Sequence, residues 1–361
     1  MLVSLLTLGS PGQLSGGYLY HDRVAALAGD HGAEIEFVSV RPWPDPFTRA
    51  DGDVVLVDSI AAWLVAPWAW RATNRRRPLA AILHQPPGGI DHGAARRRTQ
   101  AVLDRNLYRH CGLLVAASEA LREELVAPPH RLPTDRIRVV APGSDVAALP
   151  NGRVPDLRHG RRAAAVSVGN WMARKGTLEL LDALGRLPDD RVTLHLAGRD
   201  DIEPAYTERV RGRVADLGDR VVHHGVLDRD GIARLYAGAD VFVLPSWREP
   251  YGTVYGEALA AGLPVVGWRA GNLPHLVSDG VEGVVLTPGD VPALAAALDR
   301  LASDEPWRAD LARAAGRRGA ALPRWTDTAA ALFAALRELT RWGRLPARHP
   351  TTGRPAASAS P

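Results

Sequence analysis

One stretch constrains the fold of this chain more than any other: residues 241–268, VFVLPSWREPYGTVYGEALAAGLPVVGW. Apolar runs at 241–244 and 263–268 have the composition of buried parallel strands, and one short helix fits between them. Glu249 precedes that helix and Glu257 lies inside it, so the two carboxylates cannot share one helical face. The N–H groups at the start of a helix favour phosphate. The stretch therefore predicts a nucleotide-like ligand with a phosphate in its middle and a hydroxyl-rich group at each end.

The length and composition predict a two-domain protein. At 361 residues the chain exceeds the ~250–300 residues that one core usually spans. No apolar run approaches the ~20 residues of a membrane span, and the first residues, MLVSLLTLGSPGQLSGG, fit a strand that enters a glycine loop better than a signal sequence. The single cysteine, Cys111, excludes a disulfide framework and favours a reducing compartment. We therefore expect a cytoplasmic protein.

The basic residues hold a second signal. Of the 44 Lys and Arg residues, only Lys175 is a lysine. Arginine carries a planar, permanently charged fork, whereas a lysine ammonium is compact enough to sit against one phosphate or sugar oxygen. This contrast predicts a site-specific role for Lys175; chance is the alternative, since a rare residue must fall somewhere. The net charge of +4 is too small to indicate nucleic-acid binding.

The first half of the chain alternates predicted strands and helices, with strands at 2–8, 33–40, 53–58, 79–83, 112–117 and 136–141. The glycine-rich loop after the first strand has the geometry of a phosphate cradle, with a simple tight turn as the alternative. His84 follows the fourth strand, at the edge where open α/β sheets bind ligands, although a lone His is often structural. We interpret Asp51-Gly52-Asp53 as turn chemistry and not as a metal-binding D-x-D pair.

Two arginine clusters and a linker complete this half. The clusters, at 71–77 and 96–98, are either a solvated face or a patch for an anionic acceptor or the inner membrane surface. Ser118 is predicted to cap a helix at 120–126. Residues 146–162 lose all periodicity and are rich in Pro, Gly and Arg, as expected of a linker between domains.

The second half repeats the alternation, with strands at 163–168, 192–197 and 220–224 before the central stretch and helices at 177–187, 204–217, 229–239, 291–302 and 307–321. An amphipathic helix follows at 325–342 and is expected to cross back to the first domain. The predicted domains are 1–145 and 163–325, with 326–345 packed on the first. Residues 346–361 form a Pro/Ser/Ala/Thr tail that is predicted to be disordered.

The central stretch resembles the E-x7-E motif of retaining glycosyltransferases with the GT-B fold, and more specifically family 4 of these enzymes. Glu249 and Glu257 match the two acids, and the segments PSW, EALAAGLPVV and AGNLPHLV match the surrounding pattern. The resemblance implies that Glu249 contacts the donor sugar and that Glu257 binds the ribose hydroxyls. For the spacing alone, two solvated acids beside an ordinary helix are the alternative.

The loop GNWMARKG resembles the phosphate clamp of the same family. Lys175 and Gly176 match the clamp, but Asn170 stands where an Arg is expected. Either Arg174 or the Asn170 amide would have to supply the missing contact, and neutral hydrogen bonds are about half as strong as charge-assisted ones.

The resemblance also implies contacts from other loops. Gly16 and Gly17 would present N–H groups to the diphosphate from the first domain, and His84 would lie beside the donor sugar. The nucleobase would lie against the backbone near Val226. The segment AGNLPHLV would form the turn under the diphosphate, with His275 where Glu is common.

We therefore predict an α/β protein of GT-B fold: two facing, doubly wound Rossmann-like domains, with a C-terminal helix that crosses back. The predicted reaction is the transfer of a sugar, of hexosyl type, from a nucleotide-diphosphate donor to a sugar, lipid or small-metabolite acceptor with retention of configuration. No cofactor and no metal are expected, because no His/Asp cluster with ligand spacing is visible. The alternatives are a nucleotide-sugar epimerase of the same fold and a non-catalytic relic that binds sugar nucleotides.

The predicted site divides into two groups of residues. The catalytic group is Glu249, Lys175 and His84. The donor-binding group is Gly16, Gly17, Asn170, Arg174, Val226, Tyr251, Gly252, Thr253 and Glu257. Peripheral contact with an anionic membrane surface is an open alternative to a wholly cytoplasmic location, and no nucleic-acid partner is expected.

Overall fold

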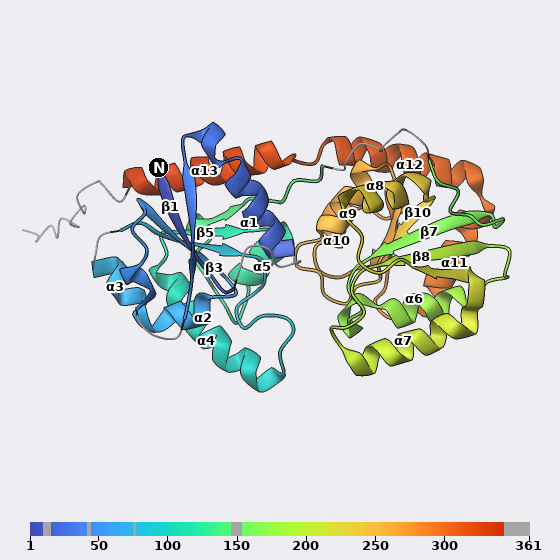
Figure 1. Ribbon diagram of the computed structural model, residues 1–361, viewed down its shortest axis with the longest axis horizontal. Helices are drawn as coiled ribbons and strands as arrows, with labels where there is room; N and C mark the ends of the chain where they lie inside the picture. The colour runs from blue at the N-terminus through green and yellow to red at the C-terminus, as the bar shows by residue number, and fades with distance from the viewer. Residues whose placement is uncertain (10–15, 42–44, 75–76, 146–153, 343–361) are drawn as a thin grey trace, which may run out of the picture.

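The computed structural model describes residues 1–9, 16–41, 45–74, 77–145 and 154–342, and it contains two α/β units side by side (Figure 1). Each unit is built on a six-stranded sheet whose strand pairs are parallel. This arrangement confirms the predicted fold class. The predicted disordered tail, 346–361, and part of the predicted linker lie outside the described residues.

The first unit has the strand order β2-β1-β3-β4-β5-β6. Its strands are β1 (Leu2–Thr7), β2 (Glu34–Ser39), β3 (Val54–Asp58), β4 (Leu79–Leu83), β5 (Leu113–Ala116) and β6 (Ile137–Val139). Its helices are α1 (Gly16–Ala26), α2 (Ala62–Val65), α3 (Ala69–Asn74), α4 (Ala94–His110) and α5 (Glu119–Val126). Strands β3 and β4 are buried throughout, as expected of a parallel sheet covered on both faces. The Ser118 hydroxyl accepts from Leu121 N at 3.1 Å, which confirms the predicted helix cap.

The second unit has the strand order β12-β11-β10-β7-β8-β9. Its strands are β7 (Ala163–Val168), β8 (Val192–Ala197), β9 (Val221–His223), β10 (Val241–Val243), β11 (Val265–Trp268) and β12 (Gly283–Leu286). Its helices are α6 (Thr177–Leu184), α7 (Pro204–Leu217), α8 (Arg229–Gly238), α9 (Thr253–Ala260), α10 (Leu273–Leu276), α11 (Val291–Ser303) and α12 (Glu305–Ala320). The two apolar runs of the central stretch are β10 and β11, which pair with each other.

The order of connections reverses between β7 and β10 in this second sheet. The chain passes from β7 to β8 and β9 on one side, and then from β10 to β11 and β12 on the other. Loops that leave neighbouring strands at such a switch point diverge to opposite faces, which opens a crevice at the carboxyl ends of the strands. The loops after β7 and β10 carry Lys175 and Glu249, respectively.

The last described helix, α13 (Trp325–Trp342), runs along the first unit (Figure 1). Its apolar face, with Leu332, Phe333 and Leu336 fully buried, belongs to the same core cluster as residues of β1, β3, β4 and β5. The C-terminal helix therefore crosses back, as predicted. No helix among the described residues has the length and apolar character needed to cross a membrane.

The two passages of the chain between the units touch each other. Ser144 N donates to Pro323 O at 3.0 Å, and Trp325 N lies 3.3 Å from Asp145 Oδ2. A Cβ at Gly143 would lie 2.3 Å from Trp325 N, so only glycine fits at this position. The segment PGSD thus joins the two passages at one point.

Candidate active site

The centre of the site is an ion pair between the solitary lysine and the first acid of the E-x7-E pair. The Lys175 ammonium is bonded to Glu249 Oε2, and the side chains are 13% and 12% exposed. Arg174 Nη1 lies 3.7 Å from the same oxygen. Burial alone would raise the pKa of Glu249, but the charges of Lys175 and Arg174 outweigh it and lower that pKa. Glu249 is therefore a carboxylate held between two cations.

Two glycines allow the backbone segments around this ion pair to pack closely. Gly176, at the start of α6, has φ 73°, and a Cβ there would lie 2.1 Å from Pro245 O in the loop after β10. Gly271 has φ 55°, and a Cβ there would lie 2.3 Å from Glu249 O. Asn272 N donates to this same carbonyl at 2.9 Å. The clamp loop and the Glu249 loop are therefore packed backbone to backbone.

Helix α9 begins beside this ion pair. Gly252 precedes it with φ 79°, and no side chain caps its first turn, which leaves N–H groups open to an anion. Thr253, the first residue of the helix, has a buried hydroxyl. Tyr251, just before the helix, packs against the first unit. Its ring lies edge-on to His84, with 5.7 Å between ring centroids.

Glu257 has different neighbours from Glu249. Its Oε2 accepts from the Tyr236 hydroxyl at 3.3 Å, and burial raises its pKa to about 7. Arg229 and Arg23 oppose this rise electrostatically. The two acids, one in the loop before α9 and one within the helix, therefore occupy separate surroundings, as the sequence predicts, and they differ in protonation near neutral pH.

These surroundings give an expected result for Glu257→Gln. The change should weaken nucleotide binding more than it lowers kcat, because the motif assigns Glu257 to the ribose. An ionised carboxylate accepts ribose hydroxyls better than its neutral form, so wild-type affinity should rise as the pH passes through about 7, and the Gln variant should lose this dependence. Calorimetric titration with nucleoside diphosphates on both sides of that pH measures the affinity and its pH dependence, and steady-state kinetics measures kcat. Unchanged affinity together with a collapsed kcat would contradict the assignment.

The first unit contributes His84, which follows β4 and faces the second unit. A Cβ at Gly17 would lie 3.2 Å from His84 Cδ2, so the start of α1 packs directly on this ring. Gly16 is the first residue of the same helix, whereas residues 10–15 of the glycine loop lie outside the described part. Among the described residues neither ring nitrogen of His84 has a hydrogen-bond partner, although both are buried. Burial, with His21 as the second cause, lowers the pKa of His84 to about 3, so the imidazole is neutral.

Two other predicted donor-binding residues lie at the rim of the site. The Asn170 side-chain oxygen accepts from Arg199 N at 3.1 Å, so this oxygen serves a neighbouring loop. Arg174, in contrast, lies beside Glu249, the partner of Lys175. Val226 follows β9 and is 55% exposed. Of the two substitutes considered from the sequence, Arg174 is the one that adjoins the ion pair of Lys175 and Glu249.

Polar contacts join the two units across the site. Arg174 Nε bonds to Asp91 Oδ1 at 2.8 Å, and Arg248 Nη2 bonds to Glu124 Oε1 at 3.0 Å. His275, which stands where the resembled family commonly has Glu, lies 3.3 Å from Glu123 of the first unit. Sequence analysis missed this pairing, because no local pattern indicates which residue of the other unit lies opposite.

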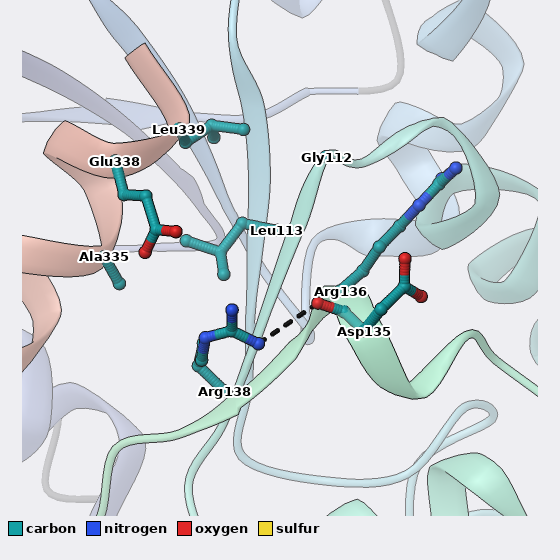
Figure 2. A pocket seen from close by; sticks show the side chains of 8 residues that line it. All are labelled: Gly112, Leu113, Asp135, Arg136, Arg138, Ala335, Glu338 and Leu339. Carbon is teal, nitrogen blue, oxygen red and sulfur yellow. Dashed lines mark hydrogen bonds between the residues drawn. The ribbon is translucent and has the colours of Figure 1, made fainter. Parts of the chain in front are cut away.

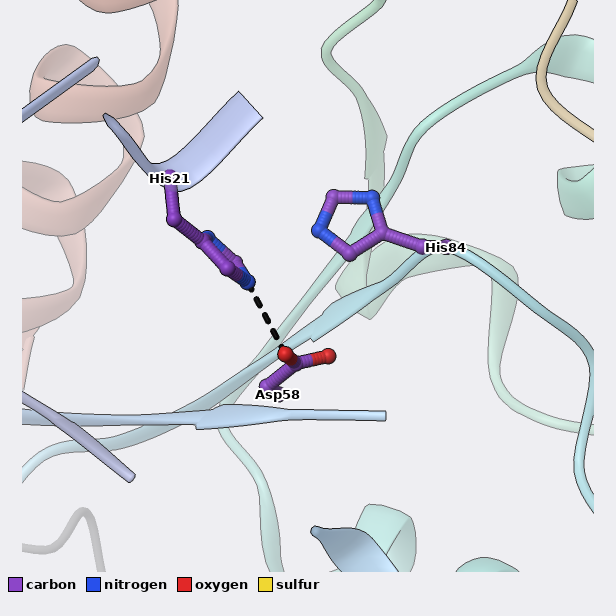
Figure 3. Close-up of side chains that lie close together, drawn as sticks. All are labelled: His21, Asp58 and His84. Atoms are coloured by element: carbon purple, nitrogen blue, oxygen red, sulfur yellow. Dashed lines mark hydrogen bonds and ion pairs between the residues drawn. The ribbon is translucent and has the colours of Figure 1, made fainter. Parts of the chain in front are cut away.

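Sequence analysis also missed His21 and Asp58, which lie beside His84 (Figure 3). His21 Nε2 is 3.0 Å from Asp58 Oδ2, and the possible ligand atoms of all three residues lie within 4.8 Å of one another. The expectation that the chain has no His/Asp cluster is therefore wrong. Residues so far apart in sequence meet only because β3 and β4 end at the edge of the sheet where α1 begins.

One cavity lies away from this site. Its volume is about 250 Å³, and it lies between α13 and the amino ends of β5 and β6 (Figure 2). Its lining residues are Gly112, Leu113, Asp135, Arg136, Arg138, Ala335, Glu338 and Leu339. None of the predicted site residues lines it, because they follow the carboxyl ends of the strands.

Comparison with known proteins identifies the family of this chain. Residues 162–304 match the family described as Glycosyl transferases group 1. A D-inositol 3-phosphate glycosyltransferase of Xylanimonas cellulosilytica is 30% identical over 313 residues, which cover 79% of this chain and 72% of that protein. Its counterpart in Mycolicibacterium smegmatis is 30% identical over 311 residues, which cover 82% and 68%, respectively. The chain is a glycosyltransferase and belongs to the glycosyltransferase group 1 family.

Solved structures with the same fold cover nearly the whole chain. Sucrose-phosphate synthase from Thermosynechococcus elongatus has a TM-score of 0.80 at 20% identity and covers 94% of this chain and 99% of its own. Anabaena HepE in complex with UDP-glucose has a TM-score of 0.73 at 21% identity, with coverage of 94% and 100%. At such identities the similarity establishes the GT-B fold.

Proposed function

We propose that this glycosyltransferase moves a hexosyl group from a nucleoside diphosphate sugar to a hydroxyl of its acceptor, with retention of configuration and without a metal ion. The observation that carries the proposal is the Glu249 carboxylate held between Lys175 and Arg174, beside the uncapped start of α9 and at the switch point of the sheet. The name of one solved structure with this fold reports bound UDP-glucose, and the curated relatives act on D-inositol 3-phosphate by name. The first name supports a nucleotide-sugar donor, and the second supports transfer to a hydroxyl-bearing acceptor.

The geometry suggests which groups would contact the diphosphate and which would contact the sugar. The diphosphate would lie against Lys175, Arg174 and the first-turn N–H groups of α9, with Gly16 and Gly17 on its other side. Preorganised positive charge of this kind stabilises the departing diphosphate without a metal. The bond from the anomeric carbon to the β-phosphate oxygen breaks, the acceptor oxygen bonds to that carbon from the same face, and the acceptor proton passes to the leaving phosphate. Glu249 and His84 would flank the sugar from the two units.

A donor screen followed by product analysis tests this proposal. Nucleoside diphosphates and their sugars should raise the Tm, since a ligand at ~100 times its Kd adds ~2.7 kcal/mol to the free energy of unfolding. With the selected donor and an acceptor, the anomeric coupling of the product should match that of the donor, and EDTA should leave the rate unchanged. Inversion would contradict retention. Loss of activity in EDTA that manganese or magnesium restores would contradict metal independence.

The same screen decides the alternatives. A nucleotide-sugar epimerase would form product from the donor without any acceptor, and a non-catalytic relic would be stabilised without consuming the donor. The family match favours transfer over both of these outcomes.

We also propose a cytoplasmic location with peripheral contact at an anionic membrane surface. On α4, Arg96 and Arg98 are exposed, and the same helix exposes Val102 (57%) and Leu103 (38%). Exposed arginines attract anionic headgroups, and apolar side chains beside them can enter the interface. The single free cysteine, Cys111, is buried, in keeping with a reducing compartment.

A further inference from the structure

Asp58 collects hydrogen bonds from three parts of the first unit. Its side chain is 2% exposed, at the carboxyl end of β3. Oδ2 accepts from the Thr7 hydroxyl at 2.9 Å and lies 3.0 Å from His21 Nε2. Oδ1 accepts from the Ser59 hydroxyl at 3.3 Å and from Ile60 N at 3.2 Å. The ends of β1 and β3 and the helix α1 are thus joined through one carboxylate.

The carboxylate is ionised, which determines the direction of these bonds. Burial would raise the pKa of Asp58, but the neighbouring His21 and the hydrogen bonds lower it to about 2. An ionised carboxylate has no proton to donate, so His21 Nε2 must carry the hydrogen that it shares with Asp58. This bond orients the His21 ring, just as the carboxylate partners of histidines at other sites set the tautomer and ring angle.

Asp58 is connected to His84 through two intermediates. The Ser59 hydroxyl, which donates to Asp58, also accepts from His84 N at 3.2 Å, so it fixes the backbone that carries the imidazole. The His21 ring, held by Asp58, meets the His84 ring edge-on, with 4.9 Å between centroids and 69° between planes (Figure 3). The backbone and the ring of His84 are therefore both supported by groups that Asp58 holds.

This hydrogen-bond network supports the His84 ring without bonding to its two nitrogens. Both buried nitrogens of His84 lack partners among the described residues, and a neutral imidazole offers one donor and one acceptor. The same three side chains could surround a cation. However, four donors already occupy the lone pairs of Asp58, so a metal would have to displace His21 from it. The hydrogen-bond pattern favours a support for His84 over a metal centre.

We propose that Asp58 and His21 form a positioning pair that holds His84 in one orientation toward the transferred sugar. This inference rests on the proposed role of His84 beside the donor sugar. Neither residue of the pair touches the substrate; each acts through His84. Displacing a reacting group by about 1 Å can cost about 100-fold in rate, so the effect of losing the pair should appear in kcat.

The first test is nitrogen NMR of the histidine rings in the protein without ligand, with His84 assigned from the His84→Ala spectrum. The wild type should show a neutral His84 with one set of ring signals. Asp58→Asn should shift or broaden the His84 ring signals, and His21→Phe, which keeps a ring beside His84 but removes the donor, should do the same. The matched control is Asp53→Asn, an exposed carboxylate just before β3 that accepts from Leu2 N at 2.9 Å. Unchanged His84 signals in Asp58→Asn overturn the proposal, whatever the donor proves to be.

The second test is a double-mutant cycle with UDP release from UDP-glucose as the assay. Asp58→Asn should lower kcat about 30-fold in the wild-type background but less than about 2-fold in the His84→Ala background, because coupled residues are not additive. The KM for UDP-glucose should change little. Equal losses in the two backgrounds would overturn the proposal. If the wild type does not turn over UDP-glucose, the donor that the thermal screen selects takes its place in the cycle, and the NMR experiment decides the positioning role independently of the donor.

Metal analysis of the purified wild type completes the design. We expect no stoichiometric metal. One equivalent of zinc that disappears in Asp58→Asn would overturn the positioning role and make the cluster a metal centre.

Discussion

Lys175→Arg is expected to lower kcat/KM by at least about 100-fold, or about 2.7 kcal/mol of transition-state stabilisation, although the charge is kept. A Cβ at Gly169 would lie 3.7 Å from Lys175 Cδ, so the lysine stem runs directly over this glycine before its ammonium reaches Glu249. The longer, planar guanidinium does not fit the same path and would place its charge away from the departing diphosphate. Steady-state kinetics with the selected donor measures the loss.

The Tm should hardly change in this variant, because the positive charge beside Glu249 is conserved. Arg211→Lys is the matched control. It makes the reverse exchange in the ion pair between Arg211, on α7, and Asp200, and its kinetics should equal those of the wild type. If Lys175→Arg kept more than about a third of the activity, Lys175 would be a bystander, and the clamp would have to be assigned to Arg174.

Gly176→Ala should remove activity and also destabilise the second unit by about 2–4 kcal/mol. The new Cβ would be placed 2.1 Å from Pro245 O at a backbone angle, φ 73°, that alanine disfavours. Neither backbone can yield without separating the Lys175 loop from the Glu249 loop. Thermal unfolding should show a fall of about 5–10 °C in the transition of this unit, and nucleotide binding should weaken in parallel.

Gly280→Ala separates the two causes. Gly280 has nearly the same angle, φ 74°, but a Cβ there meets no atom within 4 Å. This variant should show only the strain of the left-handed backbone, about 1 kcal/mol, with activity preserved. Equal losses at Gly176 and Gly280 would mean that the contact with Pro245 is unimportant.

The part of the site in the second unit could be predicted largely from local sequence. Apolar runs on both sides of Glu249 and Glu257 predict β10 and β11, and these strands place both acids at the sheet edge. The strand β12 was not predicted, because its four residues, GVVL, lie among turn-forming residues at the sheet edge. The protonation of Glu257 could not be predicted either, because it follows from burial.

The part of the site in the first unit could not be predicted in full, because it depends on tertiary contacts. His84 could be placed by its position after a strand, but its neighbours His21 and Asp58 come from elements distant in sequence and form no motif. The pairing of His275 with Glu123 joins the two units and is invisible in either segment alone. Asn170 shows a related limit: a mismatch with the clamp pattern indicates a missing charge but not that its side-chain oxygen bonds to Arg199 N.

The helix α13 has a consequence for the order in which the protein can be built. The core of the first unit includes Leu332, Phe333 and Leu336, which the ribosome adds after the whole second unit. Domains generally fold during synthesis as units, the N-terminal one first. Here α1 covers only part of one apolar face of the first sheet, and the rest stays uncovered until residues 325–342 have emerged. The second unit, although later in sequence, is therefore the one that can complete its core first.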